Sequence, residues 1–102
     1  MPDKVQYLQV HWKVKVTKAL IKFCEDHKYP SDGLTYLRDC LAALEQADLK
    51  SAVEFYRKVP LGRTMGCFDD WSPPVVLPRE TPEYVLVVFQ ALLNEWDRVM
   101  KN

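Results

Sequence analysis

The pattern of hydrophobic and polar residues along the chain predicts helices over most of its length. Over residues 3–27, apolar side chains recur at three- and four-residue steps and cationic ones fall on the opposite stripe, which is typical of an amphipathic helix. The apolar positions are Val5, Leu8, Trp12, Val16, Ala19 and Phe23, and the opposite stripe holds Lys4, His11, Lys15, Lys18 and Lys22. Because no Gly, Pro or Asn interrupts this segment, we favour one long helix.

The same segment also carries a strand-like alternation of apolar and polar residues. Val10, Trp12, Val14 and Val16 alternate with His11, Lys13 and Lys15, and a period of two is typical of a half-buried strand. An α+β fold, with a strand over residues 8–16 followed by a short helix, is therefore the alternative to an all-α fold.

Two shorter helices are predicted in the middle of the chain. Pro30 cannot continue the first helix, and Ser31 or Asp32 is suited to cap a second helix over residues 32–46. After a short break, Asp48 is the expected N-cap of a third helix over residues 49–59. The predicted apolar faces consist of Leu34, Leu37, Leu41 and Leu44, with Cys40 beside them, and of Leu49, Ala52, Val53 and Tyr56.

The last helix begins at a strong start signal, with Thr81 as N-cap and Pro82 in the first helical position, and runs to about Met100. Nine of the ten residues 84–93 are apolar, so this helix is buried by its neighbours or by a second subunit. We expect one compact all-α domain of four helices over residues 1–102. Its predicted core contains Leu37, Leu41, Phe89, Leu92 and Trp96.

Composition and charge argue against several classes of protein. The formal net charge of the 102 residues is +0, which disfavours binding to nucleic acid or an anionic membrane through bulk charge. The longest apolar run, at residues 84–89, is too short to span a bilayer. The start Met-Pro-Asp-Lys lacks a signal segment, and Cys24, Cys40 and Cys67 share no paired spacing. We therefore expect a cytoplasmic protein with reduced thiols.

Residues 60–80 form a connection that is too long to be passive, because most connections run about 4–6 residues. Its apolar residues predict a packed loop: Met65, Phe68, Trp71, Val75, Val76 and Leu77. We expect Phe68 and Trp71 to anchor it on the helices, so that its polar residues are displayed at fixed positions. Aromatic and Arg side chains dominate protein interfaces. The candidate binding residues are therefore Arg63, Asp69, Asp70 and Trp71.

No group of residues specifies a reaction. Asp69 and Asp70 are adjacent and would point in opposite directions in an extended segment, and no pattern supplies a base for Cys67. His11 and His27 lack the dense spacing of metal ligands. We predict no catalytic residue, no metal and no cofactor, and we favour a protein without enzymatic activity.

The run Val59-Pro-Leu-Gly-Arg-Thr-Met-Gly-Cys-Phe-Asp-Asp70 resembles a signature of small all-helical bacterial domains of uncharacterised function. The resemblance covers about half of the chain with one short motif, and the following Trp71-Ser-Pro-Pro departs from the expected aliphatic residues. Such domains recur among toxin-neutralising immunity proteins, which implies a binding role. The matching positions are Gly62, Met65, Gly66, Phe68, Asp69 and Asp70.

Three functions follow from these patterns. The leading hypothesis is a cytosolic, non-catalytic domain that binds a protein partner through the 60–80 loop, with a toxin-neutralising immunity protein as its specific form. The second is a small enzyme or ligand-binding domain that uses Arg63, Asp69, Asp70 and Cys67. The third is a structural homodimer built on the apolar excess of the last helix.

Overall fold

The computed structural model describes residues 4–59 and 71–101, and within these ranges every regular element is a helix. The elements are α1 (Lys4–Asp26), η1 (a 3-10 helix, Ser31–Leu34), α2 (Thr35–Glu45), α3 (Leu49–Lys58) and α4 (Pro82–Lys101). The predicted all-α fold with four α-helices is confirmed. Helix α1 is continuous through residues 8–16, so the alternative with a strand there is wrong.

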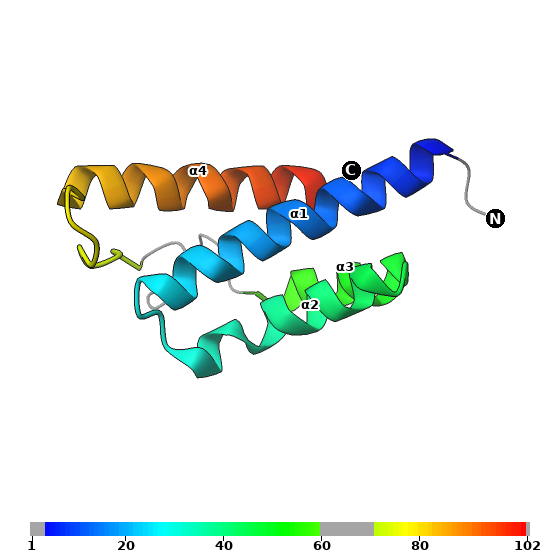
Figure 1. Cartoon of the computed structure of the whole chain (residues 1–102). Coiled ribbons are helices and arrows are strands. Elements are labelled where there is room, and N and C mark those ends of the chain that lie inside the picture. Colours follow the sequence, from blue (N-terminus) through cyan, green and yellow to red (C-terminus); the bar gives the residue numbers. More distant parts are fainter. Residues whose placement is uncertain (1–3, 60–70, 102) are drawn as a thin grey trace.

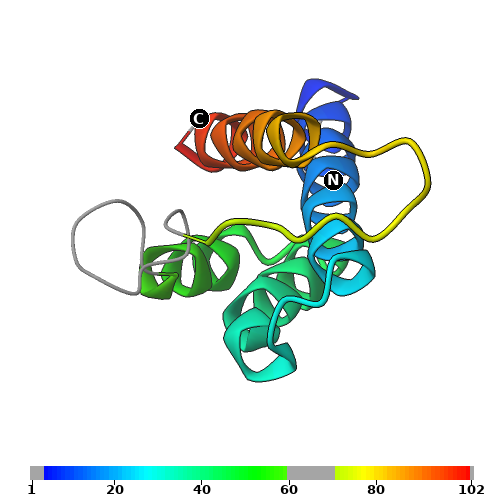
Figure 2. The ribbon, with the colours of Figure 1, turned by 90° about the vertical axis from the view of Figure 1, so that its left-hand side faces the viewer.

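Helix α1 is the central element of the bundle. It runs antiparallel to α4 and also packs against α2, which in turn packs against α3 (Figure 1). Seen along the helices, α1 lies between α4 and α2, and the segment that precedes α4 crosses one end of the bundle (Figure 2). Within the described ranges, no helix combines the length and apolar character needed to cross a bilayer.

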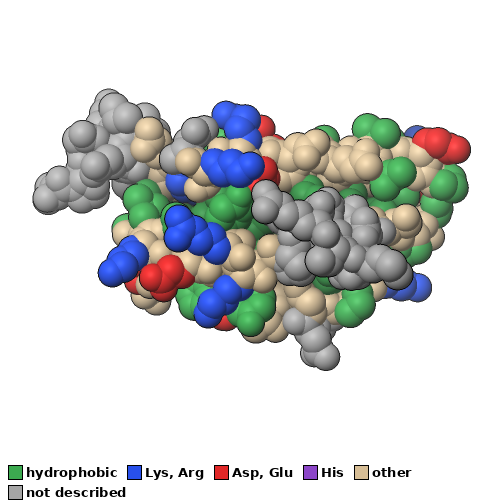
Figure 3. All heavy atoms as spheres, turned by 180° about the vertical axis from the view of Figure 1, so that it is seen from behind, with side chains coloured by type: hydrophobic (Ala, Val, Ile, Leu, Met, Phe, Trp, Pro, Cys, Tyr) green, Lys and Arg blue, Asp and Glu red, His purple; other side chains and the backbone are tan. Residues whose placement is uncertain are grey.

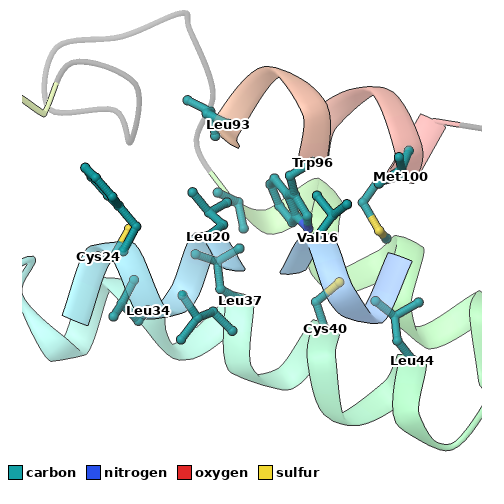
Figure 4. Packing of buried hydrophobic residues seen from close by; sticks show 14 of the residues in the cluster. Val16, Leu20, Cys24, Leu34, Leu37, Cys40, Leu44, Leu93, Trp96 and Met100 are labelled. Atoms are coloured by element: carbon teal, nitrogen blue, oxygen red, sulfur yellow. The ribbon is translucent and has the colours of Figure 1, made fainter. Parts of the chain in front are cut away.

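The hydrophobic core fills the space between α1, α2 and α4 (Figure 4). Three of the five predicted core residues, Leu37, Phe89 and Trp96, are fully buried. The prediction was too strong for Leu41 and Leu92, which are only partly buried and pack against the margin of the core.

The buried face of α1 differs from the predicted stripe. It is centred on Val16, Leu20 and Cys24, which follow one another at four-residue steps toward α2 and α4. Trp12 is 50% exposed and Ala19 is exposed, so their predicted burial was wrong, whereas Lys13 is only 7% exposed. The sequence fits both faces because apolar residues occupy three- and four-residue steps on each, and contacts with the neighbouring helices select one.

Two of the predicted helix starts are confirmed by their hydrogen bonds. The Asp48 carboxylate accepts a hydrogen bond from the backbone N–H of Ser51 at 3.2 Å, and the Thr81 hydroxyl accepts one from Tyr84 at 3.1 Å. The predicted cap at Ser31 or Asp32 was wrong, because η1 occupies these positions and the N-cap of α2 is Leu34.

Helices α1 and α2 end in the same type of turn, a Schellman motif. Lys28 and Ala47 have positive φ angles of 65° and 57°, a conformation that glycine usually supplies. In each turn the next residue donates its N–H to a carbonyl five residues back: Tyr29 to Cys24 at 2.9 Å, and Asp48 to Ala43 at 2.9 Å. These bonds satisfy carbonyl groups in the last turn of each helix. Both turns form although neither has a glycine at the position with positive φ.

Candidate functional site

The described half of the long connection, residues 71–81, crosses the end of the bundle where α1 ends and α4 begins (Figure 2). Trp71 anchors this segment, as predicted. Its ring meets Tyr29 and Phe89 edge-on, with centroid distances of 4.8 and 5.1 Å, and Phe23 lies behind at 6.4 Å. Edge-to-face packing of this kind stabilises an aromatic cluster beyond its area alone.

Of the four candidate binding residues, only Trp71 is described. Its ring is partly buried, so its main contribution here is to hold the segment on the bundle. Arg63, Asp69 and Asp70 lie outside the described residues, as do Phe68 and Cys67, and the roles predicted for them stay predictions.

A second anchor joins the segment to α1 through a buried ion pair. His27 Nε2 lies 2.8 Å from Glu80 Oε2, and the two side chains are 5% and 8% exposed. His27 Nδ1 lies 2.9 Å from the carbonyl oxygen of Phe23, and its ring stacks on the Phe23 ring with a centroid distance of 4.0 Å. Neither residue was predicted to have this role, because 53 residues separate them.

A doubly protonated imidazole beside an ionised carboxylate fits the geometry of this pair. Both ring nitrogens of His27 face oxygen atoms, and a carbonyl oxygen can only accept a hydrogen bond. Burial alone would lower the pKa of His27, but its bonds to Glu80 and Phe23, with the nearby charges of Glu80 and Asp26, raise it above 6.5. Hydrogen bonds from Leu77 and His27 hold the pKa of Glu80 below 4.5.

Glu80 also fixes the backbone of the segment that it closes. Its Oε1 accepts hydrogen bonds from the N–H groups of Val76 and Leu77 at 3.1 and 2.8 Å. The Glu80 N–H donates a hydrogen bond to the Leu77 carbonyl oxygen at 3.3 Å. Pro78 and Arg79, with a φ of 74° at Arg79, complete a turn of type II geometry. One carboxylate therefore holds both the turn and its attachment to α1.

The segment fixed in this way exposes apolar side chains. Val75, Val76 and Leu77 are 46%, 38% and 52% exposed, so the prediction that they pack inward was wrong. Tyr84 and Val87, in the first turns of α4 beside the segment, are 57% and 62% exposed. We call these five residues the end surface. Hydrophobic side chains gather at this end of the molecule in Figure 3 (right-hand side).

Among residues 4–59 and 71–101, no three His, Cys, Asp or Glu side chains are grouped as metal ligands. Cys24 and Cys40 are free thiols, as predicted, and burial raises the pKa of each to about 12. A thiol with such a pKa is a poor nucleophile at neutral pH.

Comparison with known proteins found no matching family model, no similar curated protein and no similar solved structure. Any functional conclusion must therefore come from the chain itself.

Proposed function

We propose that the protein is a non-catalytic binding domain that docks a partner protein on the end surface. The observation that carries this proposal is the exposure of five large apolar side chains, three on a segment that Glu80 and Trp71 hold in place and two on α4. Exposed apolar patches commonly mark interaction sites. A backbone that is already ordered loses less conformational entropy on binding than a flexible loop does.

The neighbouring chemistry supports a binding role over a catalytic one. The ion-paired groups at this end, His27 and Glu80, bind each other and the backbone, so they are committed to structure. A general base needs a free position within hydrogen-bond reach of a substrate proton. The hypothesis of an enzyme that uses Arg63, Asp69, Asp70 and Cys67 falls on residues outside the described ranges.

The proposal is tested with single substitutions in the end surface. Leu77→Lys and Val87→Lys place a charge at the centre of the surface without touching the core. Trp12→Lys is the matched control, because Trp12 is 50% exposed on α1, outside the end surface. Quantitative affinity capture from the source cells, followed by reconstitution with the purified partner, should show binding that the two test variants lose and the control retains.

Two results would contradict the proposal. One is that no captured protein depends on Leu77 or Val87. The other is that a partner binds the wild type and both test variants with equal affinity in the reconstituted system. Thermal unfolding of each variant, expected to match the wild type, shows that any lost binding does not come from lost folding.

The same variants separate the homodimer hypothesis from docking of a different protein. Tyr84 and Val87 leave part of the apolar excess of α4 uncovered, which is the observation that favours self-association. Analytical ultracentrifugation of the wild type and Val87→Lys decides between them. A dimer that the substitution dissociates supports a structural homodimer, and a monomer in both supports a different partner.

The immunity-type role remains the specific form that the residue 59–70 motif implies. It predicts that expression of this chain protects cells from a toxin encoded beside it. Protection should disappear with Leu77→Lys and persist with Trp12→Lys if the end surface contacts the toxin.

A further inference from the structure

A basic pocket lies near the opposite end of the bundle from the end surface. It has a volume of about 390 Å³ and opens between α1, α3 and α4. Its floor is apolar and includes Ala52, Val53 and Met100, with the exposed Leu49 at the edge. Its rim carries Tyr56, Arg57 and Lys101, and the buried Lys13 lies at the inner wall. Figure 3 shows Lys and Arg side chains gathered over α3 and the C-terminal half of α4, around hydrophobic side chains.

The charged side chains that line the pocket are all cationic: Lys13, Arg57 and Lys101. Outside the lining, Asp97 pairs with Lys101 at 2.9 Å, and the Tyr56 hydroxyl donates a hydrogen bond to the same carboxylate. A chain with a formal net charge of +0 has therefore concentrated positive charge around one hollow.

The three cations differ in what they can offer a ligand. The Lys13 ammonium is held at the inner wall, where it donates a hydrogen bond to the carbonyl of Val99 at 2.7 Å, and burial lowers its pKa. Lys101 is engaged by Asp97. Arg57 is exposed and forms no ion pair with any described carboxylate. Its guanidinium is thus the group on the rim that can bind an anion directly.

We propose that the basic pocket binds a small organic carboxylate with an apolar body. The guanidinium fork of Arg57 matches a carboxylate through two parallel N–H···O bonds, which an ammonium cannot reproduce. Lys13 and Lys101 add positive potential from the other side of the hollow. The floor accepts the apolar body, and a volume of about 390 Å³ lies within the usual range of ligand sites.

The helix ends around the pocket favour a monoanion over a phosphate dianion. Arg57 lies in the last turn of α3, and Met100 and Lys101 lie in the last turn of α4. The C-terminal end of a helix carries a partial negative charge, which opposes a ligand with two negative charges more than one with a single charge. Leu49, the first residue of α3, also lines the pocket, but Arg57 stands eight residues further along that helix, so an anion bound to Arg57 meets the C-terminal end of the dipole.

Isothermal titration calorimetry with 4-phenylbutyrate tests the proposal on the full chain. Its neutral isostere 4-phenylbutanamide and inorganic phosphate are the comparison ligands. For a carboxylate with about 12 heavy atoms we expect a Kd of about 1 mM or lower. Binding of the amide and of phosphate should be at least about tenfold weaker, since hydrogen bonds to charged groups contribute roughly that much.

Two variants locate the site. Arg57→Gln removes the guanidinium and should weaken 4-phenylbutyrate binding about tenfold or more. Lys58→Gln is the matched control, because Lys58 follows Arg57 in the same helical turn but faces the rings of Tyr36 and Phe55. This variant should bind 4-phenylbutyrate with the affinity of the wild type. Val53→Phe fills the floor and should abolish binding while leaving every cation in place.

Several results would overturn the proposal: no saturable binding of 4-phenylbutyrate, equal binding of the amide, tighter binding of phosphate, or unchanged affinity in Arg57→Gln. Far-ultraviolet circular dichroism of each variant confirms that the fold is retained. None of these readouts involves Leu77 or Val87, so the basic pocket and the end surface are tested independently.

Discussion

The two ends of the bundle use buried polar groups in different ways. Beside the end surface, His27 and Glu80 neutralise each other, and the second carboxylate oxygen binds two backbone N–H groups. At the basic pocket, the charged lining side chains are the cations Lys13, Arg57 and Lys101, and Asp97 pairs with Lys101. Both ends contain a buried titratable side chain, yet only the pocket presents a cation, Arg57, that forms no ion pair with a described carboxylate. The balance of partners, rather than burial alone, separates a structural polar cluster from a candidate ligand site.

The largest expected effect is loss of the aromatic core beneath the end surface. Phe89 is fully buried and contacts both Phe23 and Trp71, with centroid distances of 6.0 and 5.1 Å. Phe89→Ala should lower the free energy of unfolding by about 3–5 kcal/mol. Leu92→Ala, three residues further along α4 at the margin of the core, should cost less than the ~2–5 kcal/mol of a fully buried leucine. Urea unfolding measures both, and equal losses would contradict the difference in burial.

An intermediate effect is expected from the ion pair, and it should depend on pH. The raised pKa of His27 contributes stability that is complete below its usual value of 6.5 and is lost as pH rises through the folded-state pKa. The lowered pKa of Glu80 contributes stability that is present above 4.5 and is lost as pH falls through its folded-state pKa. The pair should therefore stabilise the protein most between pH 4.5 and 6.5.

His27→Gln should remove the part of this dependence that lies above pH 6.5. Thermal unfolding between pH 5.5 and 9 should show the melting temperature of the wild type falling with rising pH, and a flatter profile for the variant. His11→Gln, which changes an exposed histidine on the same helix, is the control and should keep the wild-type slope. A wild-type profile that stays flat across this range would show that the pair does not form as described.

The smallest effect is expected at the basic pocket. Tyr56→Phe removes the hydroxyl that donates a hydrogen bond to Asp97, and such a loss typically costs about 1 kcal/mol. Burial and the bond to Asp97 raise the pKa of Tyr56 to about 12, so alkaline spectrophotometric titration of the variant should lose a tyrosine that titrates near this value. Tyr36→Phe, at an exposed ring, should change neither stability nor that titration step. A loss as large as that of Phe89→Ala would contradict the contrast between the two ends.

Local patterns predicted most of the fold. The caps at Asp48 and Thr81 depend on neighbouring residues, so the helix starts could be read directly from the sequence. The buried face of α1 could not be predicted in this way. One apolar stripe contains Trp12, Val16 and Ala19, and a neighbouring one contains Val16, Leu20 and Cys24. Only packing against α2 and α4 distinguishes the two stripes.

The candidate sites were harder to predict, since their contacts join distant parts of the chain. The apolar content of residues 60–80 indicated an anchored segment, and Trp71 confirms it. That Val75, Val76 and Leu77 face outward follows from the hydrogen bonds of Glu80, which no short-range pattern encodes. The basic pocket joins Lys13 to residues of α3 and α4, 36 or more positions away, and the periodicity of the chain places this lysine only among the polar positions.

The way in which Glu80 holds residues 75–77 has a consequence for how this protein could evolve. The carboxylate binds backbone N–H groups, so the path of the segment does not depend on which side chains stand at positions 75–77. Among homologues, these three positions should vary together with the partner, while Glu80 and His27 should vary little. The end surface would then be a place where specificity can change without a cost in folding, and a natural position for grafting a new recognition sequence.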